Sequence, residues 1–119
     1  ASHHGKDPAK IEQLARYEEK DYQNFAGFLD QLTETNEPGG SLLDHTQVLL
    51  ASNLGDASAH ASSNLPTFLA GGGFKHQGHL RFDEENNYPL SNLYLRMLQK
   101  FGVQTEQFGS STGTLSELG

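Results

Sequence analysis

The chain has 119 residues, a length that fits one domain with a modest hydrophobic core. It contains no cysteine, which excludes disulfides and cysteine-ligated metals, and its net charge of −7 argues against a nucleic-acid partner, which would favour a basic surface. No apolar run approaches the roughly 20 residues that a membrane span needs.

A long amphipathic helix is predicted over Pro8–Glu34. Asp7 followed by Pro8 is a strong helix start, because Asp caps free backbone N–H groups and proline suits the first helical position. Apolar residues then recur at helical spacing: Ile11, Leu14, Ala15, Tyr22, Phe25, Phe28, Leu29 and Leu32. The segment 35–40, TNEPGG, ends the helix and turns the chain.

Two short apolar runs follow, Gln47–Ala51 and Leu65–Ala70. Neither alternates between apolar and polar residues, a pattern typical of strands buried on both faces of a parallel sheet. We therefore predict an α/β parallel-sheet layer structure in which these runs are adjacent parallel strands. The helices Pro8–Glu34 and Pro89–Phe101 are expected to pack on that sheet.

The tail 103–119 is rich in Gly, Ser and Thr and is predicted to loop over the surface of a single domain that spans 1–119. A sheet with so few strands leaves unpaired edges and apolar surface. We therefore expect the chain to self-associate as a homo-oligomer.

The segment between the two apolar runs is polar and carries Asn53, Asp56, Ser58 and His60 in quick succession. In open α/β sheets, ligands bind beyond the carboxyl ends of the strands. The sequence therefore predicts that any chemistry lies in this loop. His45 precedes the first run, at the opposite end of the expected strand, and is interpreted as structural.

Five segments carry a family resemblance: SHHGKDP, LLDHTQVLLASNLGDASAH, NLPTFLAGGGFKHQGHLRF, YPLSNLYLRMLQKFGV and FGSSTGTL. Over essentially its whole length the chain resembles the HXXSHH family, bacterial proteins of unknown function. Ser2, His3 and His4 match the S-H-H of the naming motif, whose first His would lie two residues before Ala1. The resemblance therefore implies that this chain is the C-terminal part of a longer protein.

The HXXSHH family is in turn similar to the alkaline phosphatase-like superfamily of phosphatases, sulfatases and phosphoglycerate mutases. This similarity implies a secreted or periplasmic, metal-dependent hydrolase-like protein that acts on small anionic esters of phosphate or sulfate. The present chain would be its C-terminal metal-loop portion. The nucleophile would lie upstream, so no turnover is expected from this portion alone.

The resemblance also implies a divalent-metal site, for zinc or a similar ion, at His3 and His60. Mutase-like members carry a metal-binding His shortly before an Asn-x-x-Pro-type start of a strand, and His60 stands similarly before Asn64-Leu65-Pro66. His3 and the missing first His of the motif have the spacing of a second ligand pair. Binding by this chain is expected to be weak, because two histidines leave an ion largely hydrated.

One departure supports an alternative. Active members carry an adjacent Asp-His pair after the first strand, where this chain has Asn53-Leu54. Leucine cannot bind a metal and asparagine is a weak neutral ligand. The alternative is a non-catalytic binding or assembly module that has lost one metal site.

The remaining candidates are secondary. His4 is expected to support the site rather than ligate the ion, and Asp56 is expected to ligate, to orient the imidazole of His60, or to cap a turn. His76 and His79 would line the pocket or contact an anionic substrate. Loop histidines are otherwise solvent-exposed or bonded to the backbone.

Overall fold

The computed structural model describes residues 2–83 and 85–119. The chain divides into two compact units, Ala1–Ala70 and Gly71–Gly119. The elements in chain order are α1 (Pro8–Glu34), β1 (Asn36–Glu37), β2 (Gly40–Ser41), β3 (Gln47–Ala51), β4 (Thr67–Gly71), α2 (Leu90–Lys100) and the 3₁₀-helix η1 (Ser116–Leu118). None of the helices described is both long and apolar enough to cross a membrane.

The long helix α1 confirms the prediction for Pro8–Glu34 at both ends. The carboxylate of Asp7 accepts a hydrogen bond from the N–H of Ala9 at 2.9 Å, and Pro8 occupies the first helical position. This cap satisfies one of the backbone donors that a helix start leaves free. The local chemistry that the sequence shows is therefore sufficient to set the start of the helix.

The end of α1 runs directly into the hairpin β1–β2, whose register pairs Asn36 with Ser41 and Glu37 with Gly40. Pro38 and Gly39 form the connection, and Gly39 has a φ of 101°. A proline followed by a residue with positive φ is the pattern of a type II turn, which favours glycine at its third position. The TNEPGG segment therefore ends the helix by reversing the chain.

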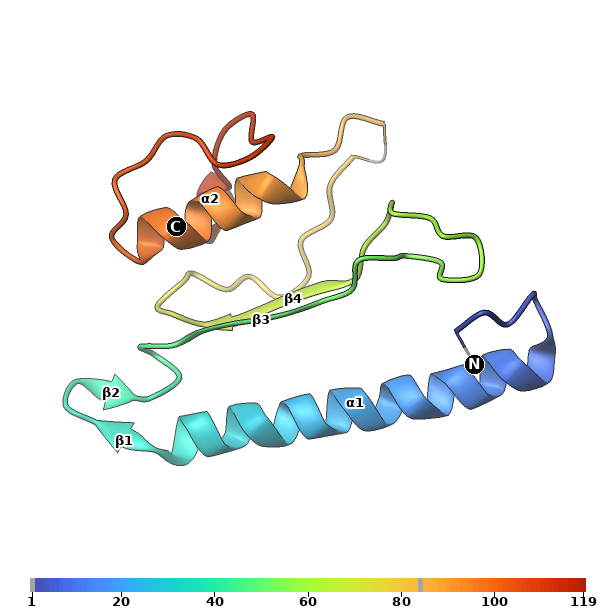
Figure 1. Cartoon of the computed structure of the whole chain (residues 1–119). Coiled ribbons are helices and arrows are strands. Elements are labelled where there is room, and N and C mark those ends of the chain that lie inside the picture. The colour runs from blue at the N-terminus through green and yellow to red at the C-terminus, as the bar shows by residue number, and fades with distance from the viewer. Residues whose placement is uncertain (1, 84) are drawn as a thin grey trace. The chain divides into compact units, whose positions relative to one another are not determined.

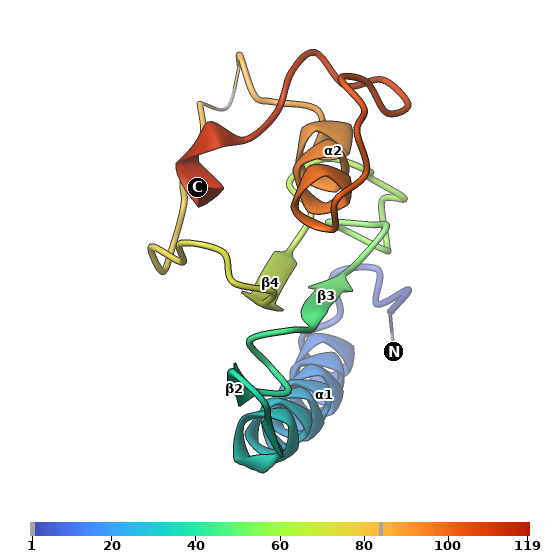
Figure 2. The same cartoon turned by 90° about the vertical axis from the view of Figure 1, so that its left-hand side faces the viewer.

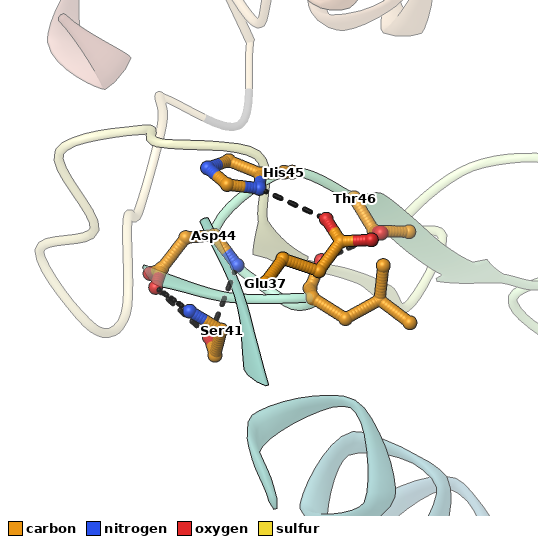
Figure 3. Close-up of polar contacts among 6 residues, drawn as sticks. Glu37, Ser41, Asp44, His45 and Thr46 are labelled. Atoms are coloured by element: carbon orange, nitrogen blue, oxygen red, sulfur yellow. Dashed lines mark hydrogen bonds and ion pairs between the residues drawn. The ribbon is translucent and has the colours of Figure 1, made fainter. Parts of the chain in front are cut away.

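Side chains hold the segment that follows the hairpin (Figure 3). The carboxylate of Asp44 accepts hydrogen bonds from the backbone N–H and the hydroxyl of Ser41 at 2.8 and 2.9 Å, and these bonds hold the pKa of Asp44 below its usual value. His45 contacts Glu37 with 3.1 Å between Nδ1 and Oε2. The expected structural role of His45 is consistent with this ion-pair geometry.

The predicted parallel sheet is wrong. β3 and β4 are adjacent, as expected, but they form a two-stranded antiparallel sheet (Figures 1 and 2). The N–H of Ser52, just after β3, donates to the carbonyl of Pro66, just before β4, at 3.2 Å. A parallel crossover usually needs a helix, whereas the loop 52–66 contains none and returns the chain directly. The chain is therefore not an α/β layer structure of the alkaline phosphatase-like kind.

The strands are also less buried than predicted. All of β3 except exposed Ala51 is half-buried, and Phe68 of β4 keeps 48% of its surface exposed. With only two strands in the sheet, neither strand has a neighbour on its outer edge within the described residues. An unbroken apolar run therefore does not require burial on both faces.

The second unit is built around α2, which is one residue shorter at each end than predicted. The tail folds back on this helix. Leu95 of α2 is fully buried, and Leu115 and Leu118 of the tail each keep only 6% of their surface exposed. Asn92 is 1% exposed and holds the tail by donating to the hydroxyl of Thr112 and accepting from its N–H at 2.9 Å. The tail therefore supplies part of the core instead of only covering the surface.

The cap of α1 gives a direct test of the fold. Replacing Asp7 by Ala should lower the free energy of unfolding by about 1 kcal/mol, because the N–H of Ala9 loses its acceptor. Asp7→Ser, which retains a capping oxygen, should cost much less. Urea unfolding followed by circular dichroism measures both variants, and equal stability of the two would contradict the capping role.

Candidate functional site

The N-terminal segment, residues 2–7, contacts the loop 52–66 near the first turn of α1 (Figure 1). The Nε2 atoms of His3 and His60 are 2.8 Å apart, and the N–H of Gly5 donates to the hydroxyl of Ser58 at 3.0 Å. These residues are more than fifty positions apart in sequence. The convergence of His3 and His60 that the resemblance implies is therefore present, while their metal-binding role stays a prediction.

The two imidazoles meet nearly head on. Their ring centroids are 5.1 Å apart, and the ring planes are perpendicular. The centroid separation exceeds the distance between the Nε2 atoms of His3 and His60 by about two ring radii, so the two nitrogens point at each other. This is the geometry of an N–H···N hydrogen bond, in which one ring donates and the other accepts.

Ser2 bears on which ring donates. Its hydroxyl oxygen lies 3.4 Å from Nδ1 of His3. If Nδ1 of His3 carries its hydrogen toward Ser2, then Nε2 of His3 is the acceptor and Nε2 of His60 is the donor. The S-H-H sequence thereby couples the orientation of the first imidazole to the residue before it.

The shape of the loop depends on a glycine. A Cβ on Gly55 would lie 2.1 Å from the carbonyl oxygen of Ser63 and 2.9 Å from that of Asn64, so only glycine fits between these backbone segments. His60 and Asn64 both have a φ of 52°. Left-handed backbone of this kind is several-fold more common for Asn and His than for most other residues. These features return the loop on itself and present His60 to the N-terminal segment.

Asp56 acts within this loop as a turn cap. Its carboxylate accepts from the N–H groups of Ser58 and Ala59 at 2.8 and 3.1 Å. The hydrogen bonds from Ala59 and Ser58, with a smaller contribution from nearby His4 and Lys6, hold the pKa of Asp56 below its usual value. The carboxylate therefore stays ionised near neutral pH and orders the backbone beside His60.

The other candidates in the first unit do not join the imidazole pair. His4 is half-buried, and its Nδ1 accepts from the N–H of Lys6 at 3.0 Å, which leaves that nitrogen in use by the backbone. Asn53 is exposed at the start of the loop. His4 thus stabilises the turn that carries His3, while its expected supporting role beside a bound ion stays a prediction.

His76 and His79 belong to the second unit. Nε2 of His76 lies 3.0 Å from the carbonyl oxygen of Gly71, and its ring meets that of Phe74 edge on, with centroids 6.1 Å apart. His79 is exposed. His76 therefore bonds to the backbone, the alternative that the sequence left open for loop histidines.

The pair has nitrogen donors of the type that zinc prefers, but only two of them. An ion bound at 2.0–2.1 Å by two nitrogens in tetrahedral geometry separates them by about 3.3 Å and receives their lone pairs at about 109°, so the rings would have to move apart and turn out of their head-on arrangement. Over residues 2–83 and 85–119, no group of three or more His, Cys, Asp or Glu side chains converges in a way that could hold a metal. The residues present therefore fit a two-histidine, weakly held ion.

The sequence did not single out Gly5 or Gly55 as members of this site, and Ser58 was named only among the polar residues of the loop. The Gly55-Asp56 pair was the available signal, since Gly and Asp together mark a tight turn. The bond from Gly5 to Ser58 joins segments far apart in sequence. No local pattern could have shown it.

Comparison with protein-family models, with curated proteins and with solved structures gives no match to this chain. The HXXSHH resemblance stays a prediction that rests on the motifs quoted above.

Gly55 tests how the loop presents His60. Gly55→Ala should destabilise the first unit by about 1–3 kcal/mol, because the added methyl would collide with two backbone carbonyls. NMR signals of the His3 and His60 imidazoles should shift as the loop opens. Gly27→Ala is the matched control: a Cβ at this position in α1 meets nothing within 4 Å, so it should stabilise the protein by up to about 1 kcal/mol. An unchanged His60 signal in Gly55→Ala would contradict the role of this glycine.

Proposed function

We propose that His3 and His60 form a two-histidine site for a divalent transition metal such as zinc, within a metal-dependent hydrolase-like protein that acts on phosphate or sulfate esters. The observation that carries the proposal is the 2.8 Å separation of the two Nε2 atoms. Imidazole nitrogen is a preferred ligand of zinc, and two such nitrogens stand about 0.5 Å closer together than a tetrahedral ion would hold them, so that a turn of the two rings would make room for the ion.

The loop architecture supports this function in a specific way. Asp56 and Gly55 order the backbone that bears His60, and the bond from Gly5 to Ser58 brings the segment with His3 against it. Pre-positioned ligands lower the cost of ordering on binding. A bound ion would polarise an ester oxygen and neutralise developing negative charge. With only two protein ligands, coordination positions remain for a small anionic ester.

The second candidate is a non-catalytic binding or assembly module. Asn53-Leu54 favours it, because this pair replaces an Asp-His pair that would supply two strong ligands. The absence of any third converging ligand among residues 2–83 and 85–119 favours it as well. In this case the histidine pair would join the N-terminal segment to the loop and would not serve chemistry.

Two further parts of the proposal concern the location of the protein and its assembly. A secreted or periplasmic location rests on the family resemblance alone. Self-association is supported by the sheet β3–β4, where each strand lacks a neighbour on one edge within the described residues.

Zinc titration by calorimetry tests the metal site. The unaltered protein should bind zinc, and His3→Ala and His60→Ala should each weaken binding by at least about tenfold, because each removes one of two ligands. His79→Ala is the control, since this exposed histidine of the second unit should leave the affinity unchanged. Equal binding by all four proteins would overturn the proposal.

A second arm separates the two candidate functions. Methylphosphonate mimics an anionic ester and cannot be hydrolysed as one. The hydrolase-like function predicts that it tightens zinc binding, because it would occupy open positions on the ion. No effect of methylphosphonate on the zinc affinity would favour the non-catalytic module.

A further inference from the structure

The apolar face of α1 is only partly covered in the first unit. Leu32 is buried, and three further apolar residues of the helix are half-buried: Leu14, Phe25 and Leu29. Ile11 and Tyr22 lie at the margin of the same face and keep 43% and 41% of their surface exposed. The apolar stripe is therefore wider than the surface that packs against it.

A shallow depression lies along this uncovered margin. Its lining residues recur at helical spacing and share one face of α1: Ala15, Glu18, Glu19, Tyr22, Gln23 and Ala26. Ala15 and Ala26 are small and leave room on either side of the Tyr22 ring. That ring packs edge on against Phe68 of β4, with centroids 5.4 Å apart. The depression therefore has an aromatic centre that β4 holds in place.

The charged side chains that line the depression are both acidic. Glu18 and Glu19 line it, and its lining contains no Lys or Arg. Nearby Arg16 is engaged by Glu12 at 2.6 Å. Over its length α1 carries six acidic and three basic residues, and the whole chain has a net charge of −7. The field here attracts cations and repels a second copy of the same face, a nucleic acid or an anionic membrane.

We propose that this surface, the Tyr22 face (Ile11, Ala15, Glu18, Glu19, Tyr22 and Ala26), binds a cationic amphipathic helix of a partner protein. Packing of a second helix on α1 needs apolar residues at helical spacing, and Ile11 and Tyr22 supply them. The alanines allow close approach of a second helix axis. Lys or Arg residues that flank the partner's apolar stripe meet Glu18 and Glu19. The inference does not depend on the histidine pair.

A pair of designed peptides tests this proposal. The probe is a fluorescent 14-residue helix with leucines on one face and lysines on the other, and the matched control carries glutamates in place of the lysines. Fluorescence anisotropy at low ionic strength should show binding of the leucine–lysine peptide only. Tyr22→Ala should weaken that binding by about tenfold or more, as loss of an aromatic anchor does, and so should the double variant Glu18→Lys, Glu19→Lys.

Two further variants keep the test sharp. Tyr17→Ala removes an aromatic ring that is 60% exposed but lies on another face of α1, so it should leave binding unchanged. Tyr22→Ala could lose binding because the helix itself is lost, which circular dichroism would show. Tyr22→Phe controls for this, since it retains the ring and should retain binding. Equal binding of both peptides, or an equal loss in Tyr17→Ala, would overturn the proposal. So would sedimentation showing a dimer of the chain that Tyr22→Ala dissociates, since a second copy would then cover this face.

Discussion

The contact between the N-terminal segment and the loop 52–66 is the interaction on which the candidate site depends. His3 and His60 meet through their Nε2 atoms, and Gly5 is bonded to Ser58 beside them. Each hydrogen bond alone contributes modestly to stability, because folding exchanges bonds to water for bonds within the protein. What makes the contact specific is that both sides are ordered independently, one by the start of α1 and the other by the fold of the loop.

The loop reaches this state through backbone chemistry. Gly55 allows two chain segments to pass at a distance that no side chain would tolerate. The Gly55 N–H donates to the carbonyl of Ala61 at 2.8 Å, and the Ala61 N–H returns to the carbonyl of Asp56 at 3.0 Å. The Asp56 carboxylate then satisfies the N–H groups within the turn. A polar loop of fifteen residues thus carries its own internal bonds and needs little apolar burial.

The sequence predicted those features that local chemistry decides. The bounds of α1 follow from Asp7-Pro8 at one end and Pro38-Gly39 beyond the other, and β3 has the predicted bounds as well. The strand direction was predicted wrongly, because an unbroken apolar run fits a neighbour of either direction, and the polar connection 52–66, which has no helix, was the better signal. The start of β4 moved from Leu65 to Thr67, past Pro66, which lacks the N–H that a ladder position requires.

The site also contains features that local sequence patterns show and features that they do not. The pairing of His3 with His60 came from the family resemblance and not from any local pattern, and the residues that enforce it, Gly5, Gly55 and Ser58, join distant segments or act by lacking a side chain. A metal ion bound at this pair would have two nitrogen ligands from the protein. This limit follows from the described residues, among which no third ligand converges. Because only two ligands are present, the pair either holds an ion weakly or serves as a purely structural contact.

The most direct test of the account is the proximity of the two imidazoles in solution. In protein labelled at histidine, NMR should show a nuclear Overhauser cross-peak between the Hε1 protons of His3 and His60, and ¹⁵N shifts should show one Nε2 with a hydrogen and the other without. His3→Ala should then change the His60 signals while leaving those of His76 in place. A missing cross-peak, together with His60 signals that do not respond to His3→Ala, would contradict the pairing on which the site is built.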